Sequence, residues 1–313
     1  MSKKKSGFLL TLLFILSLPS HFIYSEDIKP FKSRFSLKLT AGWGSALPMG
    51  DVNDCLDSFN NNKVFKEHRD YKTGLVEGEI RTLDDRFFHA EAELLFDLTS
   101  SISLGIATSP PIRKNNESSL TYTILGWAGP QITTWTFRPE IKISFPIRLS
   151  AYYKFSFIPR LNISLGGGTG FYFAKISQLL RIDQIPPSGN PAWYTWDQKA
   201  KRNFSLGFHG NTCLEYLLTN RLALVAEFQY IHSKIKGFTG SIKLETIYGD
   251  KHEMSGTLYY FASWDSSIAA TYSSIEIHKT QPEGGCRYFE DIRKAALNLN
   301  GYSFKFGVKV RLF

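Results

Sequence analysis

Apolar and polar residues alternate along eight stretches of the chain, which is the pattern of β-strands with one apolar and one polar face. The stretches lie at about 34–45, 86–98, 102–106, 135–157, 161–176, 204–218, 222–230 and 301–313. In the fourth stretch the apolar phase runs from Trp135 to Phe157 without a slip. The pattern predicts an all-β fold with eight antiparallel strands in up-and-down order.

The segments between these stretches have two very different lengths. Turns of about three residues join the second stretch to the third, the fourth to the fifth and the sixth to the seventh. The other connections are long loops at about 46–83, 113–131, 177–203 and 237–298. Short turns at one end and long loops at the other are typical of a transmembrane β-barrel with periplasmic turns and extracellular loops. An even strand number also allows the sheet to close without free edges.

Aromatic residues gather toward both ends of the predicted strands, as the two interfaces of a membrane select. Toward the long-loop ends lie Trp43, Phe88, Trp135, Phe137, Phe171, Phe173, Phe204, Tyr230 and Tyr302. Toward the short-turn ends lie Phe35, Phe96, Phe155, Phe157, Tyr216 and Phe313. A soluble lipocalin-like barrel would show the same alternation with its apolar face turned inward, and the belts and loop asymmetry favour the transmembrane alternative.

The first 25 residues have the features of a secretory signal peptide. Three lysines, Lys3 to Lys5, precede an apolar run at 8–18 that is too short to span a bilayer, and small or polar residues lead to Ser25. We therefore expect residues 1–25 to be removed and 26–313 to form one barrel domain. Losing three lysines and no acid lowers the formal net charge from +9 to +6, spread along the chain, and an exported protein of this charge is not expected to bind nucleic acid.

With these features, residues 34–313 resemble the family of small bacterial outer-membrane β-barrel proteins. The segment "LGGGTGFYF" and the aromatic last strand ending at Phe313 carry the resemblance together with the strand and loop rhythm. It implies residence in the outer membrane, contact with outer-membrane lipid, and a last strand that the barrel assembly machinery reads through Tyr302, Phe304, Phe306 and Phe313. Arg311 and Lys309 break the usual apolar phase before Phe313, and a bulge would restore it.

If the apolar faces contact lipid, the opposite faces point into an interior that only side chains can fill. The predicted lumen network consists of Glu91, Glu93, Asp97, Arg138, Glu140, Lys142, Glu215, Glu227, Lys305 and Lys309. Further charges on these faces are Lys38, Arg148, Lys154 and Arg311. Because buried charges must be paired, we expect an ion-pair network that plugs the barrel. A small porin-like passive pore for ions or solutes is the alternative.

The sequence holds little that indicates catalysis. It has no His-Glu-x-x-His helix, no Gly-x-Ser-x-Gly elbow and no Cys-x-x-Cys pair, so we expect neither an enzyme nor a bound metal or cofactor. His89 and His209 face inward near acids, which keeps a His and carboxylate hydrolase or acyltransferase as an alternative. Cys55 and Cys286 fall in the first and last long loops and are a possible disulfide.

The long loops hold the most individual sequence. Val52, Cys55, Leu56 and Phe59 have helical spacing, with Asp51 as a possible N-cap, and predict a short helix over the barrel mouth. The last loop, about 237–298, is too long and too aromatic for a solvated connection and is expected to form extra strands. These features predict a structural, adhesive or partner-binding role through the extracellular loops.

Overall fold

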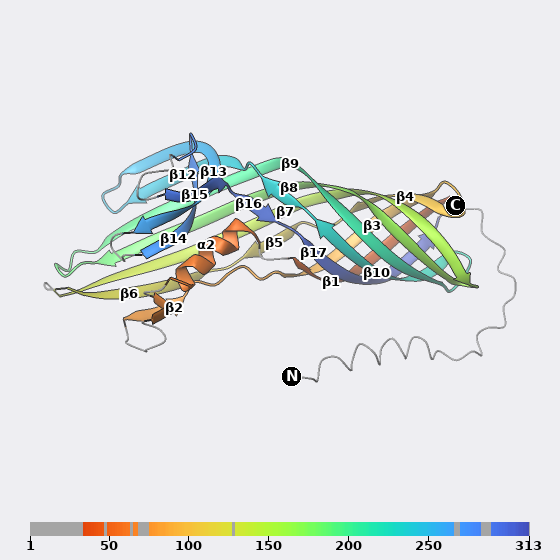
Figure 1. Cartoon of the computed structure of the whole chain (residues 1–313), viewed down its shortest axis with the longest axis horizontal. Coiled ribbons are helices and arrows are strands. Elements are labelled where there is room, and N and C mark those ends of the chain that lie inside the picture. Colours follow the sequence, from red (N-terminus) through yellow and green to blue (C-terminus); the bar gives the residue numbers. More distant parts are fainter. Residues whose placement is uncertain are drawn as a thin grey trace.

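Eight antiparallel strands form a closed ring in the computed structural model, which describes residues 34–46, 49–62, 65–67, 75–126, 129–265, 270–282 and 289–312. In spatial order they are β1 (Phe35–Ala46), β3 (Arg86–Asp97), β4 (Ile102–Thr108), β7 (Gly129–Ile158), β8 (Leu161–Ile185), β9 (Ala192–Leu217), β10 (Leu222–His232) and β17 (Gly301–Arg311). The last strand, β17, pairs with β1 over its whole length, so the ring has no free edge (Figure 1). The predicted fold class is confirmed.

The stagger of this ring follows from its strand register. Directly paired residues run from Phe35 through Phe96, Leu104, Ala151, Gly167, Gly210, Tyr230 and Tyr302, and return to β1 at Ser45, ten residues later. With roughly 3.3 Å per residue and 4.8 Å between strands, eight strands and this stagger give a tilt of about 40° and a barrel radius of roughly 8 Å. Only side chains fit inside such a barrel.

The outer face of the ring is apolar and exposed, which requires lipid around it. Large aliphatic and aromatic residues with at least 37% exposure cover it, among them Leu39, Leu94, Leu104, Ile106, Ile147, Leu149, Leu165, Leu206, Leu224 and Phe306. Rings meet near both ends of β1, where Trp43 lies 6.1 Å from Phe88 and Phe35 lies 5.0 Å from Phe96. A lipocalin-like barrel would bury these residues, so that alternative is wrong.

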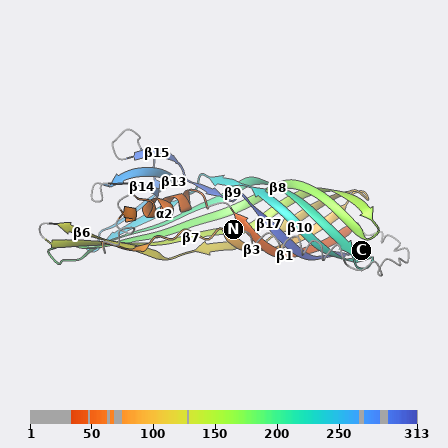
Figure 2. The same ribbon diagram turned by 60° about the horizontal axis from the view of Figure 1, so that its bottom comes forward.

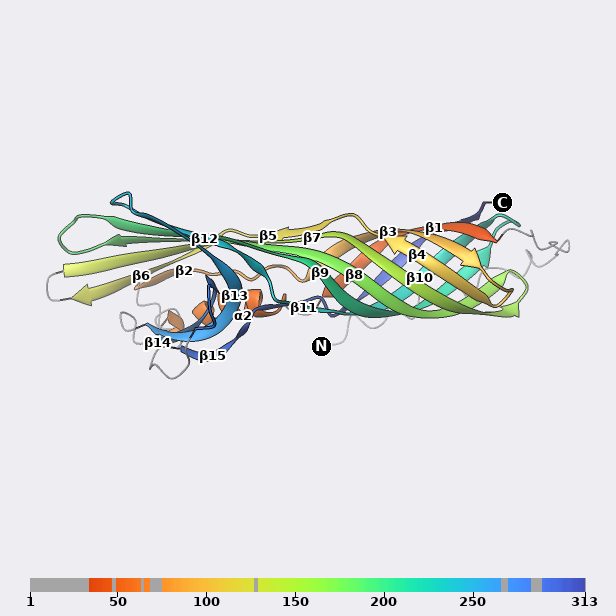
Figure 3. The same cartoon turned by 90° about the horizontal axis from the view of Figure 1, so that it is seen from above.

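Three strands continue far beyond the membrane. β7, β8 and β9 contain 30, 25 and 26 residues, whereas about 9–11 residues cross a bilayer. Their outer halves form a curved extracellular sheet with β2 (Val76–Glu79), β5 (Ile112–Asn115), β6 (Ser118–Gly126), β12 (Thr239–Thr246), β13 (Lys251–Asp265), β14 (Ala270–His278) and β15 (Phe289–Lys294) (Figures 2 and 3). The segments expected to be loops at 113–131 and 177–203 are therefore largely strands, because backbone pairing continues above the lipid. The last long segment, 237–298, contains extra strands as expected.

Two bulges mark the boundary between barrel and extracellular sheet. In β7, Ser144 pairs with Phe173 and Ile147 with Phe171, so two residues of β7 oppose one of β8. This extra residue reverses which side chains face inward. A second irregularity in β9 lies on the other side of β8 at the same level, between the pairs of Tyr172 and Ala174.

The reversal corrects the uninterrupted phase that the sequence predicts for β7. Ile147 and Leu149 face lipid at 42% exposure each, whereas Ile141 and Ile143, of the same odd phase, are buried above the bulge. Above the bulges, inward side chains are apolar and build a core of their own, which includes Trp135, Phe137, Ile176, Ile242, Leu258, Ile275 and Ile277. The extracellular part of the sheet thus has a hydrophobic core of its own side chains.

The predicted short helix is present as α2 (Asp51–Asn60), and its apolar side is buried against this core. Gly50, with φ of 62°, occupies the N-cap position in place of the expected Asp51. Two short strands, β11 (Lys234–Lys236) and β16 (Ala296–Asn298), pair beside it. Within the described residues, no helix has the length and apolarity needed to cross a membrane.

Candidate functional site

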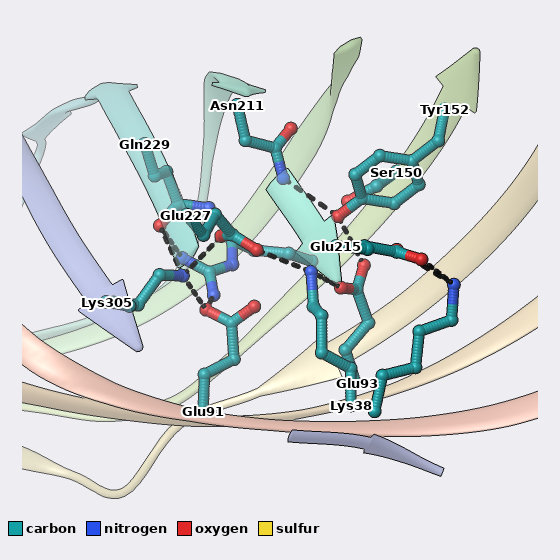
Figure 4. Close-up of polar contacts among 12 residues, drawn as sticks. Lys38, Glu91, Glu93, Ser150, Tyr152, Asn211, Glu215, Glu227, Gln229 and Lys305 are labelled. Carbon is teal, nitrogen blue, oxygen red and sulfur yellow. Dashed lines mark hydrogen bonds and ion pairs between the residues drawn. The ribbon is translucent and has the colours of Figure 1, made fainter. Parts of the chain in front are cut away.

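A line of alternating charges occupies the barrel interior (Figure 4). Arg148 contacts Glu91, whose Oε2 lies 2.8 Å from Lys305 Nζ. Lys305 in turn lies 2.7 Å from Glu227 Oε1. Glu227 Oε2 accepts from Lys38 Nζ at 2.5 Å, and Lys38 also contacts Glu93. The order of signs is therefore plus, minus, plus, minus, plus, minus across five strands.

The interior charges balance. Lys309 forms a separate pair with Glu215, at 2.8 and 2.9 Å to its two carboxylate oxygens. Four buried cations (Lys38, Arg148, Lys305, Lys309) thus face four buried carboxylates (Glu91, Glu93, Glu215, Glu227), all at most 5% exposed. Toward the short turns, Lys154 Nζ lies 2.5 Å from Asp97. Because each ion has partners of opposite sign, the low-dielectric interior can hold them.

Polar groups outside the predicted set extend the line at both ends. Tyr152 donates to Glu93 Oε1 at 2.7 Å and accepts from Asn211 Nδ2 at 2.8 Å. Gln229 accepts from Arg148 Nη1 at 2.7 Å. Gly166 makes room for the Tyr152 ring, because a Cβ there would lie 2.4 Å from Tyr152 Cδ1. Tyr152, Asn211 and Gln229 share the inward phase of the charged residues, which is the signal in the sequence that could have identified them.

Three residues assigned to the lumen network lie outside it. Arg138, Glu140 and Lys142 precede the β7 bulge and therefore point to the outer face of the extracellular sheet. Arg138 pairs with Glu117 at 2.7 Å and Glu140 with Arg113 at 3.0 Å, all in solvent-accessible positions. The structure thus brings together the predicted Glu91, Glu93, Asp97, Glu215, Glu227, Lys305 and Lys309, and separates these three.

The two inward histidines contact hydroxyl groups. His89 Nε2 lies 3.1 Å from Ser109 Oγ, and His209 Nε2 lies 2.9 Å from Ser150 Oγ. All four side chains are buried, and within the described residues the Nδ1 atoms of both histidines have no hydrogen-bond partner. A hydrolytic dyad needs an orienting group on that nitrogen, and the described residues place none there.

Apolar residues close the lumen on its extracellular side. Met49, Phe87, Ile143, Tyr172 and Leu299 surround a small cavity of about 40 Å³ directly above Arg148 and His89. Met49 is 1% exposed. The charged plug is therefore covered by an apolar layer before the extracellular domain begins.

Helix α2 bridges two edges of the extracellular sheet. On one side, Asn53 exchanges two hydrogen bonds with the backbone of Leu83, at 3.0 and 2.9 Å, and Asn60 does the same with Ile80. On the other side, Asp51 accepts from the Ala296 backbone N–H at 2.7 Å.

The same edge of α2 continues along β14. Ser58 Oγ accepts from the Ser273 backbone N–H at 2.8 Å, and Arg293 Nη2 donates to Asp51 at 3.0 Å. The helix thus supplies hydrogen-bond partners to backbone groups of β14, of β16 and of the segment that follows β2.

A cavity of about 80 Å³ lies between α2 and the extracellular sheet. Its lining is mainly aromatic and aliphatic, with Phe59, Trp135, Phe137, Leu180, Ile182 and Trp196. Gln198 donates to Gln178 at 3.0 Å and to the Ile275 carbonyl at 2.6 Å, whereas its own Oε1 has no partner among the described residues. This is the arrangement of apolar walls and few polar groups that small-molecule sites use.

The cysteine and C-terminal predictions rest on partly described residues. Cys55 is a free buried thiol that donates to the Ser273 carbonyl at 3.1 Å, and burial raises its pKa to about 12. Its predicted partner Cys286 lies outside the described residues, so the disulfide stays a prediction. Tyr302, Phe304 and Phe306 face outward on β17 at 51%, 45% and 60% exposure, while Phe313 also lies outside the described residues.

The ring is closed, its outer band is apolar with aromatic belts, and its interior charges cancel. Such a barrel is stable in a lipid bilayer. The chain is an integral outer-membrane β-barrel. No family model and no curated protein matches it.

Three solved structures show what this barrel is similar to. The outer membrane protein OprG from Pseudomonas aeruginosa has 10% identity and a TM-score of 0.39, over 91% of this chain and 98% of its own. The outer membrane protease OmpT from Escherichia coli has 8% identity and a TM-score of 0.28, over 92% and 99%. A Pseudomonas aeruginosa FadL homologue has 6% identity and a TM-score of 0.19, over 90% of this chain and 91% of its own. With TM-scores this low, the assignment of this chain rests on its own geometry.

Proposed function

We propose that the protein is a closed, non-conducting outer-membrane anchor that holds a partner-binding sheet domain outside the cell. The observation that carries this proposal is the continuation of β7, β8 and β9 into an extracellular sheet with its own hydrophobic core. A barrel that only needs to span lipid has no use for strands of this length. The neutral interior and its apolar cover support the closed state of the anchor.

The far end of the sheet supports contact with a partner. Its hairpin tips expose Leu125 at 71%, Ile185 at 48% and Tyr248 at 83%. The tips are neighbours, because Ile185 pairs with Ile132 of the β6–β7 hairpin and the Ile247 N–H donates to the Trp193 carbonyl at 3.1 Å. Exposed apolar residues grouped at one end of a stiff sheet are what adhesive or partner contacts use.

Two measurements test this proposal. Mature protein reconstituted in planar bilayers in 1 M KCl is expected to give no conductance steps, and steady ohmic steps would instead establish the passive pore. Cells displaying the chain are expected to adhere to protein-coated wells, and L125S/I185S/Y248S should abolish the adherence. The matched control K243S/E253S changes exposed residues of the same sheet and should keep it. Equal adherence of both variants would contradict a role for the tips.

The cavity under α2 favours a second candidate function, the binding of a small apolar molecule with one hydrogen-bond donor for Gln198 Oε1. Trp135 and Trp196 line the cavity, so an occupant should quench their fluorescence. Indole is a suitable probe, and I242F, which adds bulk at a buried residue that lines the cavity, should abolish saturable quenching. Unchanged fluorescence at millimolar indole in the wild-type protein would contradict this function.

A further inference from the structure

We infer that three lysines on the outer face of β7, β8 and β9 form a binding site for the phosphate groups of an outer-leaflet lipid. The residues are Lys142, Lys175 and Lys201, called the lysine ladder below. Lys142 pairs directly with Lys175, and Lys175 directly with Lys201, on three adjacent strands. The inference concerns the membrane boundary and does not depend on the proposed partner binding.

The register of the ladder is unfavourable without an anion. Directly opposed residues have Cβ atoms about 4.5–5.5 Å apart, and like charges at that distance destabilise a sheet. All three lysine side chains are exposed on the same face of the sheet. Three adjacent strands span roughly 10 Å, which matches the size of one phosphorylated head group.

Neighbouring charges on the same sheet are arranged differently. Lys199 lies 2.7 Å from Asp197, Lys251 2.9 Å from Glu245, and Lys243 3.5 Å from Glu253. Among the described residues, no carboxylate lies within ion-pair distance of the three ladder lysines. Arg113, opposite Lys142 on β5, uses its guanidinium on Glu140 and closes that end of the row. Among the described residues, the lysine ladder is thus a row of three directly opposed cations without a carboxylate partner.

The height of this row identifies the occupant. Lys175 is the first outward residue above Phe173 on β8, and Phe173 is 38% exposed on the lipid side. Phe204, 53% exposed, follows Lys201 across the β9 bulge, and its ring centroid lies 5.6 Å from that of Phe171. Two residues of strand advance about 7 Å, so the ammonium groups stand at head-group level above the last aromatic side chains. Basic residues at that level attract anionic lipid.

The test uses the folded mature protein in a neutral detergent, titrated with diphosphorylated lipid A and read by native mass spectrometry. The variant K142Q/K175Q/K201Q is compared with K199Q/K243Q/K251Q, which removes the same charge from paired lysines of the same sheet. A lysine near an anionic surface contributes about fivefold in affinity, so the ladder variant should bind roughly 100-fold more weakly. The control variant should change less than about threefold. Heat-modified migration on gels verifies that both variants fold.

Further arms separate the phosphate from its source. Dephosphorylated lipid A should bind the wild-type protein as weakly as phosphorylated lipid A binds the ladder variant. Inorganic phosphate at 10 mM should not displace lipid A, because it lacks the acyl chains that lie against Phe173 and Phe204. Equal loss in both variants, equal binding of dephosphorylated lipid, or full displacement by inorganic phosphate would each overturn the inference.

Discussion

Replacing Lys305 by methionine tests the central claim about the barrel interior. Its ammonium group has no exposure and lies 2.8 Å from Glu91 and 2.7 Å from Glu227. At an effective dielectric constant near 20, each contact is worth about 6 kcal/mol of Coulomb energy before desolvation and repulsion from other cations. Removing one partner of a buried ion pair typically costs about 3–5 kcal/mol, since it leaves an uncompensated charge. We expect K305M to lower the unfolding free energy by that amount.

The double variant K305M/E227Q separates charge balance from lost packing. It restores a neutral interior, with Lys38 still on Glu93 and Arg148 still on Glu91, so it should be more stable than K305M alone. The assay is reversible urea unfolding in lipid vesicles, followed by tryptophan fluorescence. K243M, which removes an exposed ion-pair partner, serves as the control and should cost less than about 1 kcal/mol. A loss below about 1 kcal/mol for K305M, or a double variant no better than the single one, would refute the reasoning.

Three further changes test other parts of the structure. Burial raises the pKa of Cys55 to about 12, so at pH 8 its thiolate fraction is about a thousandfold below that of an ordinary thiol. In a C213S/C286S background, iodoacetamide should therefore label Cys55 only after unfolding, and prompt labelling of that native variant would contradict this. N53A removes both hydrogen bonds from α2 to Leu83 and should cost about 1–3 kcal/mol, visible as faster proteolysis near α2, with exposed N190A as an unchanged control. Deleting one residue at 145–146 abolishes the β7 bulge and should disrupt the extracellular core, whereas normal protease resistance of that domain would show that the bulge does not set the phase.

The barrel could be predicted because each strand has one face in lipid and the other in the polar interior, which gives a regular period-two pattern. In β1, β3, β10 and β17 the odd or even phase that faces lipid never changes, and the final pairing of β17 with β1 follows from closure. The extracellular sheet could not be foreseen in the same way. Ile147 faces lipid below the bulge and Ile143 faces a protein core above it, yet both are apolar residues of the same phase. The sequence pattern therefore does not distinguish the two environments.

The candidate site shows the same limit. Glu91, Glu93 and Lys305 lie where their phase placed them, because no bulge interrupts their strands within the barrel. Arg138, Glu140 and Lys142 share the phase of Arg148 but lie beyond the bulge, so the same reasoning put them on the wrong face. Pairings between strands distant in sequence, such as Lys38 with Glu227, depend on the order and stagger of the ring. Phase alone carries no information on either.

Most cations of this sheet have an acid partner both inside the barrel and above the membrane, and this bears on the lysine ladder. Inside the barrel, where water is excluded, every cation is matched by a carboxylate. Above the membrane, where water screens charge and pairing matters least, most cations of the sheet still have an acid partner. Solubility does not explain three adjacent unpaired lysines at Lys142, Lys175 and Lys201, because acids alternate with bases in the next rows of the same face. An anion supplied by the membrane explains why the protein provides none at this level.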